Sequence, residues 1–396
     1  MSDSVPIWLL VLTTLAGCAI TKAETGGLVA ADGRVFFLPP KYPGQEYGHG
    51  VSLVVDPRFG VDIRDGRHKL MAEPFYRLDP VDDRRSHADV REASYKLAYR
   101  GGKLGLGVGQ LAWGVLESFR PTDILNQTDF VEAVDGTAKL GQPFVEGGWG
   151  NGKVTITAYY LPYFRERTFQ GIHGRPRGAV AVDTNHPQFE TALKQWQPSG
   201  AVRVAVHAGG VDLGIALFSG YSREPRFILQ LGDLSVSPRY ELMHRALADI
   251  QWSKKGLTLK AEGFFCIYSD ALILFGGGGG GLDYTFFDIG KGVDLTLVAE
   301  VLFDTRPDNA PLTFFKHNVF GGVRLAVNDR GNTELTAGAF VDFLDGTTWG
   351  RFEAKRRFGE RWQVAASVNV FFGQQGTIPG AFNRDHYGQL RVAYLF

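Results

Sequence analysis

One connection in the chain, 109–142, gathers the side-chain types that bind or select solutes. It includes Trp113 and Gly114 at the end of a strand-like stretch and then runs V-L-E-S-F-R-P-T-D-I-L-N-Q-T-D-F. Its polar side chains include those of Glu117, Arg120, Asp123, Asn126 and Asp129. Folded into a water-filled lumen, such a loop would narrow the lumen and set its charge. The alternative is a structured surface loop in which Asp and Asn bond their own backbone.

A second group of charges lies in the longest stretch without strand periodicity, 163–199. It consists of Arg165, Arg167, Arg175 and Arg177. Rings of arginine in a pore favour anions, so these residues predict an anion-selecting constriction. The alternative is a solvated outer loop whose arginines contact lipopolysaccharide phosphates or nothing.

Charged residues also recur in the middle of strand-like segments, on one face only. They are Lys96, Arg100, Arg203, Asp212, Lys260, Glu262, Asp294, Glu300, Arg324, Asp342, Arg351, Glu353, Lys355 and Arg391. Because both signs are mixed, cross-strand ion pairs are the simplest interpretation, and a specific binding site is the alternative. In either case we expect these side chains to face a wet interior.

Sequence motifs of enzymes and metal sites are missing. His173, His186 and His207 have no G-x-S-x-G partner, and neither H-E-x-x-H nor a Cys/His metal spacing occurs. The run Gly276–Gly281 is followed by neither a lysine nor a helix pattern, so it does not predict a phosphate cradle. We therefore expect no enzyme, no catalytic residue, no metal and no cofactor.

The segments that carry these residues alternate apolar and polar side chains with a period of two. In 293–304 the odd positions are all apolar, and every polar residue occupies an even position. This alternation indicates half-buried strands, and 51 glycines with 13% aromatic residues fit many strands and tight turns. The sequence predicts an all-β fold of about 18 antiparallel strands, with about 16 as the alternative. The uncertain segments are Val51–Ile63 and the glycine run, which we expect to be a loop or a kinked strand top.

The chain ends in a strand-like stretch, D-H-Y-G-Q-L-R-V-A-Y-L-F, over residues 385–396. A strand that crosses a bilayer needs about 9–11 residues. This ending resembles bacterial outer-membrane β-barrel proteins, porins among them, whose last strand alternates in this way and ends in Phe. The resemblance implies that Tyr394 and Phe396 belong to the signal read by the barrel-assembly machinery. The connection after Trp113 and Gly114 is similar to that of some porin-like and polysaccharide-export barrels.

Two further patterns favour a membrane barrel over a soluble sandwich. Aromatic residues lie near the predicted strand ends, as interfacial girdles require: Tyr99, Trp113, Trp149, Tyr160, Tyr163, Trp252, Phe303, Trp349, Trp362 and Phe372. Short turns also interleave with long connections, as in outer-membrane barrels with short periplasmic turns. We expect one up-and-down transmembrane barrel over 24–396, with lipid and lipopolysaccharide outside and both termini periplasmic. The connections 114–142 and 163–199 are the ones expected to fold into the lumen.

The N-terminal segment, 1–23, is typical of a targeting signal. Val5–Ala16 forms an apolar core that is too short to span a membrane. The stretch L-A-G-C ending at Cys18 matches the bacterial lipobox, which predicts a lipid on Cys18. Cleavage after Ala23 by an ordinary signal peptidase is the alternative, and both imply export.

Composition and resemblance together favour a transport function. Lysine plus arginine equals aspartate plus glutamate, at 42 each, so no basic field predicts nucleic-acid binding. The resemblance implies a porin-like channel in the outer membrane of a Gram-negative bacterium that passes small hydrophilic solutes, anions included. The alternatives are an export or assembly conduit for an envelope polymer and a structural barrel plugged by 114–142. An outer-membrane hydrolase is less favoured.

Overall fold

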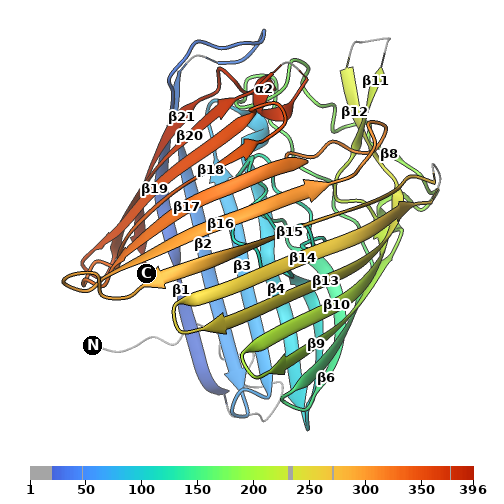
Figure 1. Cartoon of the computed structure of the whole chain (residues 1–396), viewed down its shortest axis with the longest axis vertical. Coiled ribbons are helices and arrows are strands. Elements are labelled where there is room, and N and C mark those ends of the chain that lie inside the picture. The colour runs from blue at the N-terminus through green and yellow to red at the C-terminus, as the bar shows by residue number, and fades with distance from the viewer. Residues whose placement is uncertain (1–19, 47, 231–234, 270–271, 375) are drawn as a thin grey trace.

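The computed structural model describes residues 20–46, 48–230, 235–269, 272–374 and 376–396 of the 396-residue chain. The predicted lipidation site, Cys18, and most of the targeting segment lie outside the described residues. Eighteen antiparallel strands form one closed sheet (Figure 1). The last strand pairs with the first, from Leu28 opposite Leu395 to Phe36 opposite Tyr387. The sheet therefore has no open edge, which is the only form in which a sheet is stable in hydrocarbon.

The barrel strands follow one another around the ring in chain order. They are β1 (Ile20–Phe36), β2 (His49–Ile63), β3 (His68–Leu78), β4 (His87–Tyr99), β5 (Gly102–Gly109), β6 (Gln142–Gly150), β7 (Val154–Leu161), β9 (Ser199–Ala208), β10 (Val211–Tyr221), β13 (Leu242–Lys254), β14 (Leu257–Tyr268), β15 (Leu274–Phe286), β16 (Val293–Asp304), β17 (His317–Val327), β18 (Thr333–Asp342), β19 (Thr348–Phe358), β20 (Trp362–Phe372) and β21 (Tyr387–Leu395).

The remaining elements are short and lie in the connections. A small separate sheet contains β8 (Gln188–Phe189), β11 (Arg226–Gln230) and β12 (Ser235–Tyr240). Helical turns occur at η1 (Asp83–Arg85), η2 (Lys194–Trp196) and α2 (Ile378–Ala381). Over the described residues, no helix is long and apolar enough to cross a membrane.

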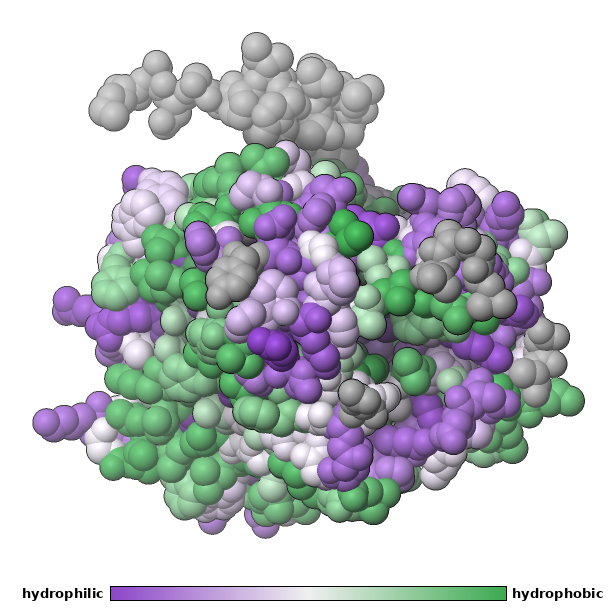
Figure 2. Space-filling model, turned by 90° about the horizontal axis from the view of Figure 1, so that it is seen from above, coloured by the Kyte–Doolittle hydropathy of each residue, from purple (hydrophilic) through white to green (hydrophobic). Residues whose placement is uncertain are grey.

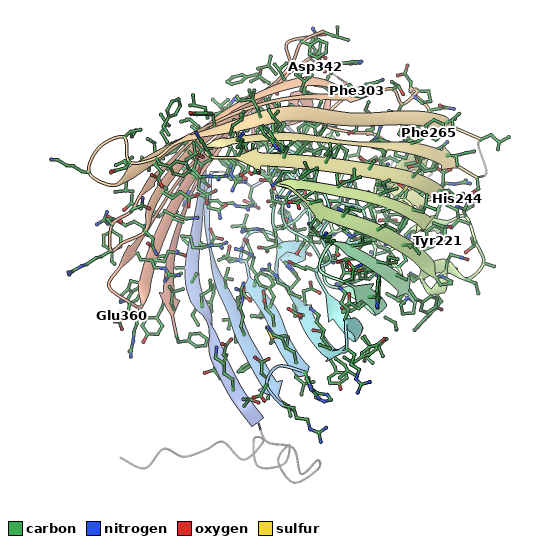
Figure 3. All side chains as sticks on the ribbon, turned by 60° about the horizontal axis from the view of Figure 1, so that its bottom comes forward. Tyr221, His244, Phe265, Phe303, Asp342 and Glu360 are labelled. Atoms are coloured by element: carbon green, nitrogen blue, oxygen red, sulfur yellow. The ribbon has the colours of Figure 1, made fainter. Side chains whose placement is uncertain are left out.

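Side chains along the strands alternate between an apolar exterior and a largely polar interior. On β16, Val301 and Phe303 face outward and are 49% and 52% exposed, whereas Glu300 and Asp304 face inward and are buried. Phe265 on β14 is equally exposed, and Figure 3 labels it and Phe303 near the rim that is far from the short turns. A continuous apolar exterior of this size is unfavourable in water and marks a contact surface. Burial against lipid would remove that cost.

The two ends of the barrel differ in the length of their connections. Short turns lie at the lower end in Figure 1, and the long connections 37–48, 79–86, 110–141, 162–198, 222–241, 305–316 and 373–386 lie at the other. Both described chain ends belong to the short-turn end, since Thr21 accepts a hydrogen bond from the Asp65 amide and Leu395 donates one to the Arg361 carbonyl. That this end is periplasmic stays a prediction.

The strand count of 18 is confirmed, and Val51–Ile63 is part of β2. The glycine run was expected to be a loop or a kinked strand top; it lies in the first part of β15, and the loop and the kink were wrong. Gly276–Gly281 lies within β15 and pairs regularly with β14, from Gly276 opposite Phe265 to Gly281 opposite Lys260. The reason is space: a Cβ on the inward-facing Gly279 would lie 2.8 Å from Leu116 Cδ1 and 2.5 Å from Leu302 Cδ2. The close approach of a loop requires glycine here, despite its entropic cost in a strand.

Two of the aromatic residues expected at the membrane interfaces point inward instead. Trp113 and Trp349 are buried, whereas Tyr99, Trp149 and Trp362 are exposed at the short-turn end as predicted. Trp113 packs edge-on against Tyr159, and Trp349 stacks on Phe315. Their positions in the sequence indicated that these indoles lie near strand ends, but not whether they face lipid or the lumen. Their packing against the interior connections decides this.

Candidate functional site

The segment 110–141, which joins β5 to β6, crosses the barrel lumen. Its Glu117 carboxylate pairs with Arg324 on β17, and β17 is nine strands away from β5 in either direction around the ring. Glu132 of the same segment accepts a bond from Arg34 on β1 through its backbone carbonyl, at 3.1 Å. In Figure 1 this turquoise chain runs behind β14 and β15, inside the sheet. One connection therefore reaches from β5 across the lumen to the opposite wall.

Two wall carboxylates hold the first part of the segment by its backbone. Glu262 on β14 accepts the amides of Val115 (2.5 Å) and Thr122 (3.2 Å), and Glu300 on β16 accepts those of Glu117 (2.8 Å) and Ser118 (3.0 Å). Both carboxylates were expected to face the interior, and the structure places them there. Between them lies the glycine surface of β15, on which Leu116 packs. Carboxylates that accept backbone amides make strong, oriented hydrogen bonds.

A buried ion network holds the other part of the segment. Arg77 on β3 donates to both carboxylate oxygens of Glu132, at 2.6 and 2.7 Å, and to Asp32 on β1 at 3.1 Å. Arg391 on β21 also donates to Asp32, at 2.7 Å. Arg77 and Asp32 are fully buried. Each buried charge has an opposite partner, so removing one partner leaves an uncompensated buried charge and is costly.

The other polar residues predicted in the segment have structural partners. Asn126 closes the neck of the segment: its amide nitrogen donates to the carbonyls of Gly109 (2.9 Å) and Leu140 (2.7 Å). Asp129 accepts from Thr168 at 2.8 Å. Asp123 pairs with Lys139, and the exposed Arg120 donates to the Leu116 carbonyl. The structure thus brings these residues together as supports of the segment's own shape.

The four arginines of 162–198 do not form a ring. Arg165 pairs with Asp89 at 2.7 Å, and Arg175 pairs with the buried Asp385 at 2.7 Å. The guanidinium of Arg177 donates hydrogen bonds to backbone carbonyls, including that of Ile172 at 3.0 Å. Arg167 and Arg177 both line a cavity. The anion selectivity expected of the group stays a prediction.

The other charges expected on the lumen wall mostly form local pairs with wall neighbours. Lys96 pairs with Glu92, Arg203 with Asp249, Lys260 with Asp283, Arg351 with Glu353 and Lys355 with Glu334. Arg100 was placed wrongly: β4 ends at Tyr99, and Arg100 has a φ of 23° in the tight turn to β5. At the chain end, the Tyr394 hydroxyl accepts from Arg361 at 3.0 Å and Phe396 is exposed.

A cavity of about 550 Å³ opens above the inserted segment, at the long-connection end. Aromatic and aliphatic side chains form most of its wall: Phe119, Phe130, Phe169, Phe227, Phe314, Phe315, Ile378 and Phe382. Five separate connections supply them. Figure 2 looks onto this end and shows a hollow near the middle of the face with hydrophobic residues inside it.

Sequence reasoning missed two parts of this arrangement. Asp32, Arg34 and Arg77 carry the same signal as the wall charges that were found, because each is a charged residue between outward-facing apolar neighbours in a strand. The aromatic cavity left no such signal, since its residues lie in connections without periodicity. No group of three or more side chains able to hold a metal ion occurs in the described part of the chain.

Comparisons with known proteins support the fold. No family model and no curated protein matches the chain. A mutant of Rh. blastica porin aligns over 95% of this chain and 100% of its own, at 13% identity and a TM-score of 0.47. Wzi of Escherichia coli, described as an outer-membrane carbohydrate-binding β-barrel involved in group 1 capsule assembly, aligns over 92% of this chain and 83% of its own. Its identity is 9% and its TM-score 0.52, a likeness of fold.

Proposed function

We propose that this protein is a solute-specific channel of the bacterial outer membrane whose bore is closed by the segment 110–141 in the state seen here. The observation that carries the proposal is the reach of this one segment across the lumen, from β5 to Arg324 on β17 through Glu117, and to Arg77 on β3 through Glu132. An apolar exterior and a closed sheet support the membrane location. Passage then requires that part of the segment moves.

The cavity at the long-connection end supports a narrower solute class than the resemblance implied. A site lined mainly by aromatic and aliphatic side chains with a few polar groups is typical of selective ligand pockets. Arg167 at its wall agrees with the expectation of anions, whereas the aromatic lining favours a solute with an apolar part. The proposed order is binding in the cavity, displacement of the segment, and release toward the short-turn end.

A structural barrel is the second candidate. The buried pairs of Arg77 with Asp32 and Glu132 favour it, because breaking a fully buried ion network costs several kcal/mol, about 3–5 for one partner. However, Glu117 and Arg324 are each about one-third exposed, and ion pairs at such sites contribute little, about 0–1 kcal/mol. The pair of Glu117 with Arg324 is therefore a weak ionic contact of the segment with the wall, and movement of this half must also release the amides held by Glu262 and Glu300.

A reversible cross-link separates the two candidates. Glu117→Cys and Arg324→Cys are joined by a bismaleimide with a cleavable spacer, while Cys266 is fully buried and does not compete. We expect proteoliposomes of the unlinked variant to take up small monoanions, the linked form to fall to the level of protein-free liposomes, and cleavage to restore uptake.

The matched control joins Glu334→Cys to Lys355→Cys, a pair within the wall whose side chains lie 2.9 Å apart in the native protein. This link should leave uptake unchanged. Absence of uptake by the native protein would support the structural barrel instead. Uptake that survives the link from Glu117 to Arg324 would mean that solutes pass without displacement of the segment.

A further inference from the structure

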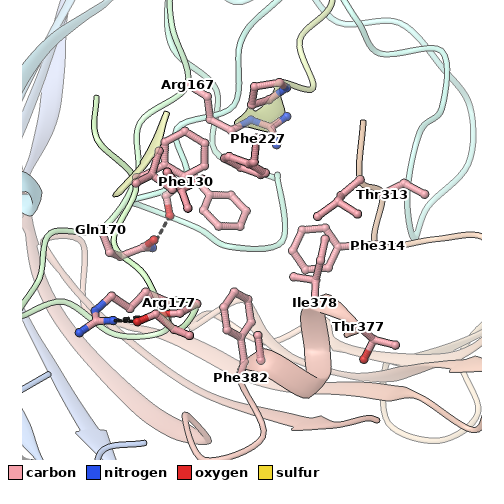
Figure 4. A pocket seen from close by; sticks show the side chains of 18 of the residues that line it. Phe130, Arg167, Gln170, Arg177, Phe227, Thr313, Phe314, Thr377, Ile378 and Phe382 are labelled. Atoms are coloured by element: carbon pink, nitrogen blue, oxygen red, sulfur yellow. Dashed lines mark hydrogen bonds between the residues drawn. The ribbon is translucent and has the colours of Figure 1, made fainter. Parts of the chain in front are cut away.

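Five charged residues are among the described residues that line the aromatic cavity: Lys41, Asp135, Arg167, Arg177 and Glu224. In Figure 4, Arg167 and Phe227 lie at one end of the cavity, and Ile378 and Phe382 lie at the opposite end. The rings between them are in mutual contact: Phe130 and Phe169 have centroids 6.0 Å apart, and Phe169 and Phe227 5.6 Å apart. The space is therefore an apolar slot that ends at a guanidinium group.

Arg167 lacks the partners that the neighbouring arginines have. Its Nη2 donates to the Arg223 carbonyl at 2.8 Å, and its Nε lies 3.4 Å from Gln127 Oε1. Its Nη1 has no hydrogen bond and its guanidinium no carboxylate within 4.0 Å, as far as the described residues extend. By contrast, Arg177, which also lines the cavity, bonds backbone carbonyls with its guanidinium (Figure 4).

Glu224, the carboxylate whose charge acts on Arg167, is already engaged by other arginines. Glu224 pairs with Arg306 at 3.0 Å and with Arg245 at 3.6 Å, and Asp304 pairs with Arg306 at 2.7 Å. Arg223 donates only to backbone carbonyls, among them that of Leu125 at 2.8 Å. Among the described residues of this cluster, Glu224 and Asp304 are thus the two carboxylates beside four arginines, which are Arg167, Arg223, Arg245 and Arg306. Burial lowers the pKa of Arg167 and of Arg223, because a buried cation is unfavourable, and the charge of Glu224 offsets this only in part at Arg167.

We propose that this cavity binds an amphipathic monoanion, a molecule with an apolar body and a single carboxylate, whose carboxylate pairs with Arg167 while its body contacts the phenylalanine rings. The proposal names the solute class of the proposed channel and in that respect rests on it, although binding itself requires no transport. A volume of about 550 Å³ falls within the usual range of small-molecule sites, about 300–1,000 Å³. The carboxylate supplies the missing counter-charge, and a guanidinium binds it in a fork-like geometry.

Calorimetry on the full barrel in amphipol tests the proposal with a pair of water-soluble probes. The probes are 4-phenylbutanoate and its uncharged amide, 4-phenylbutanamide. We expect the native protein to bind the carboxylate about tenfold or more tighter than the amide, because a hydrogen bond to a charged group is worth about 1.5–3 kcal/mol. Octanoate in place of 4-phenylbutanoate shows whether the body must be aromatic.

Two variants locate the site. Arg167→Gln should remove the preference for the carboxylate and leave the affinity for the amide unchanged. Phe227→Leu should weaken the binding of both probes alike. Arg165→Gln is the matched control, since Arg165 lies outside the cavity and pairs with Asp89; it should bind as the native protein does. Equal affinity for acid and amide, unchanged carboxylate binding by Arg167→Gln, or no binding of any probe would each overturn the proposal. Binding without liposome uptake would leave this site standing and contradict only the channel.

Discussion

Replacing residues 115–136 by a short Gly–Ser linker should convert a nearly silent barrel into an open pore. The change removes every contact of the segment with Glu262, Glu300 and Arg324. What remains is an 18-stranded barrel with a charged interior, and barrels of about 16–18 strands without a plug contain an aqueous channel. Single-channel recording in planar bilayers should show large, ohmic current steps that the native protein lacks.

The matched control for this deletion removes the hairpin of β11 and β12. That hairpin stands above the rim in Figure 1 and belongs to the separate three-stranded sheet. Its removal shortens the long-connection end but leaves the inserted segment in place, so the barrel should stay nearly silent. A folded deletion variant of 115–136 without current would show that other parts of the chain close the lumen.

Arg77→Met should destabilise the barrel by about 3–5 kcal/mol, because it leaves Asp32 and Glu132 buried with too few counter-charges. Asp32 keeps Arg391 at 2.7 Å, but Glu132 loses both of its short bonds. Urea unfolding in detergent, followed by tryptophan fluorescence, measures the change. The control is Arg58→Met, which removes a 3.0 Å pair with Glu73 from a side chain that is 60% exposed and should cost at most about 1 kcal/mol.

The same network gives the stability a defined pH dependence. Burial raises the pKa of Glu132, but the charges of Arg77, Arg85 and His87 together lower it by more. The net pKa therefore lies below the ordinary 4.5. The stabilisation is therefore complete above about pH 4.5, the value in the unfolded chain, and is lost as the pH falls through the lower value in the folded state. In Arg77→Met this loss on acidification should be much smaller.

The sequence predicted the strands well because each strand has an inside and an outside. Glu262, Glu300 and Arg324 could be placed on the inner face from alternation alone. Their partners could not be predicted. Val115 and Ser118 bind these carboxylates through backbone amides, which every residue type has, and the segment has no periodic pattern that would indicate its conformation. The glycine run was misread for a related reason: its close packing against Leu116 depends on a loop distant in sequence.

The arginines show the same limit at the candidate site. Four residues of one type in one connection indicated a single site, yet Arg175 is taken up by Asp385, more than two hundred residues later. Arg167 and Arg177 both line the cavity without a carboxylate partner among the described residues, but the guanidinium of Arg177 is occupied by backbone carbonyls whereas Nη1 of Arg167 has no hydrogen bond. Which of several similar side chains retains an unpaired charge depends on contacts between connections, and a single sequence does not contain that information.

Hydrogen exchange at the amides of Val115, Glu117 and Ser118 tests the crossing of the lumen most directly. If these amides bond to Glu262 and Glu300, they should exchange as slowly as amides in the paired strands, and Glu262→Gln with Glu300→Gln should speed their exchange while the strand amides stay protected. Exchange in the native protein as fast as in the exposed turn 151–153 would contradict the account, because the segment would then lie free of the wall.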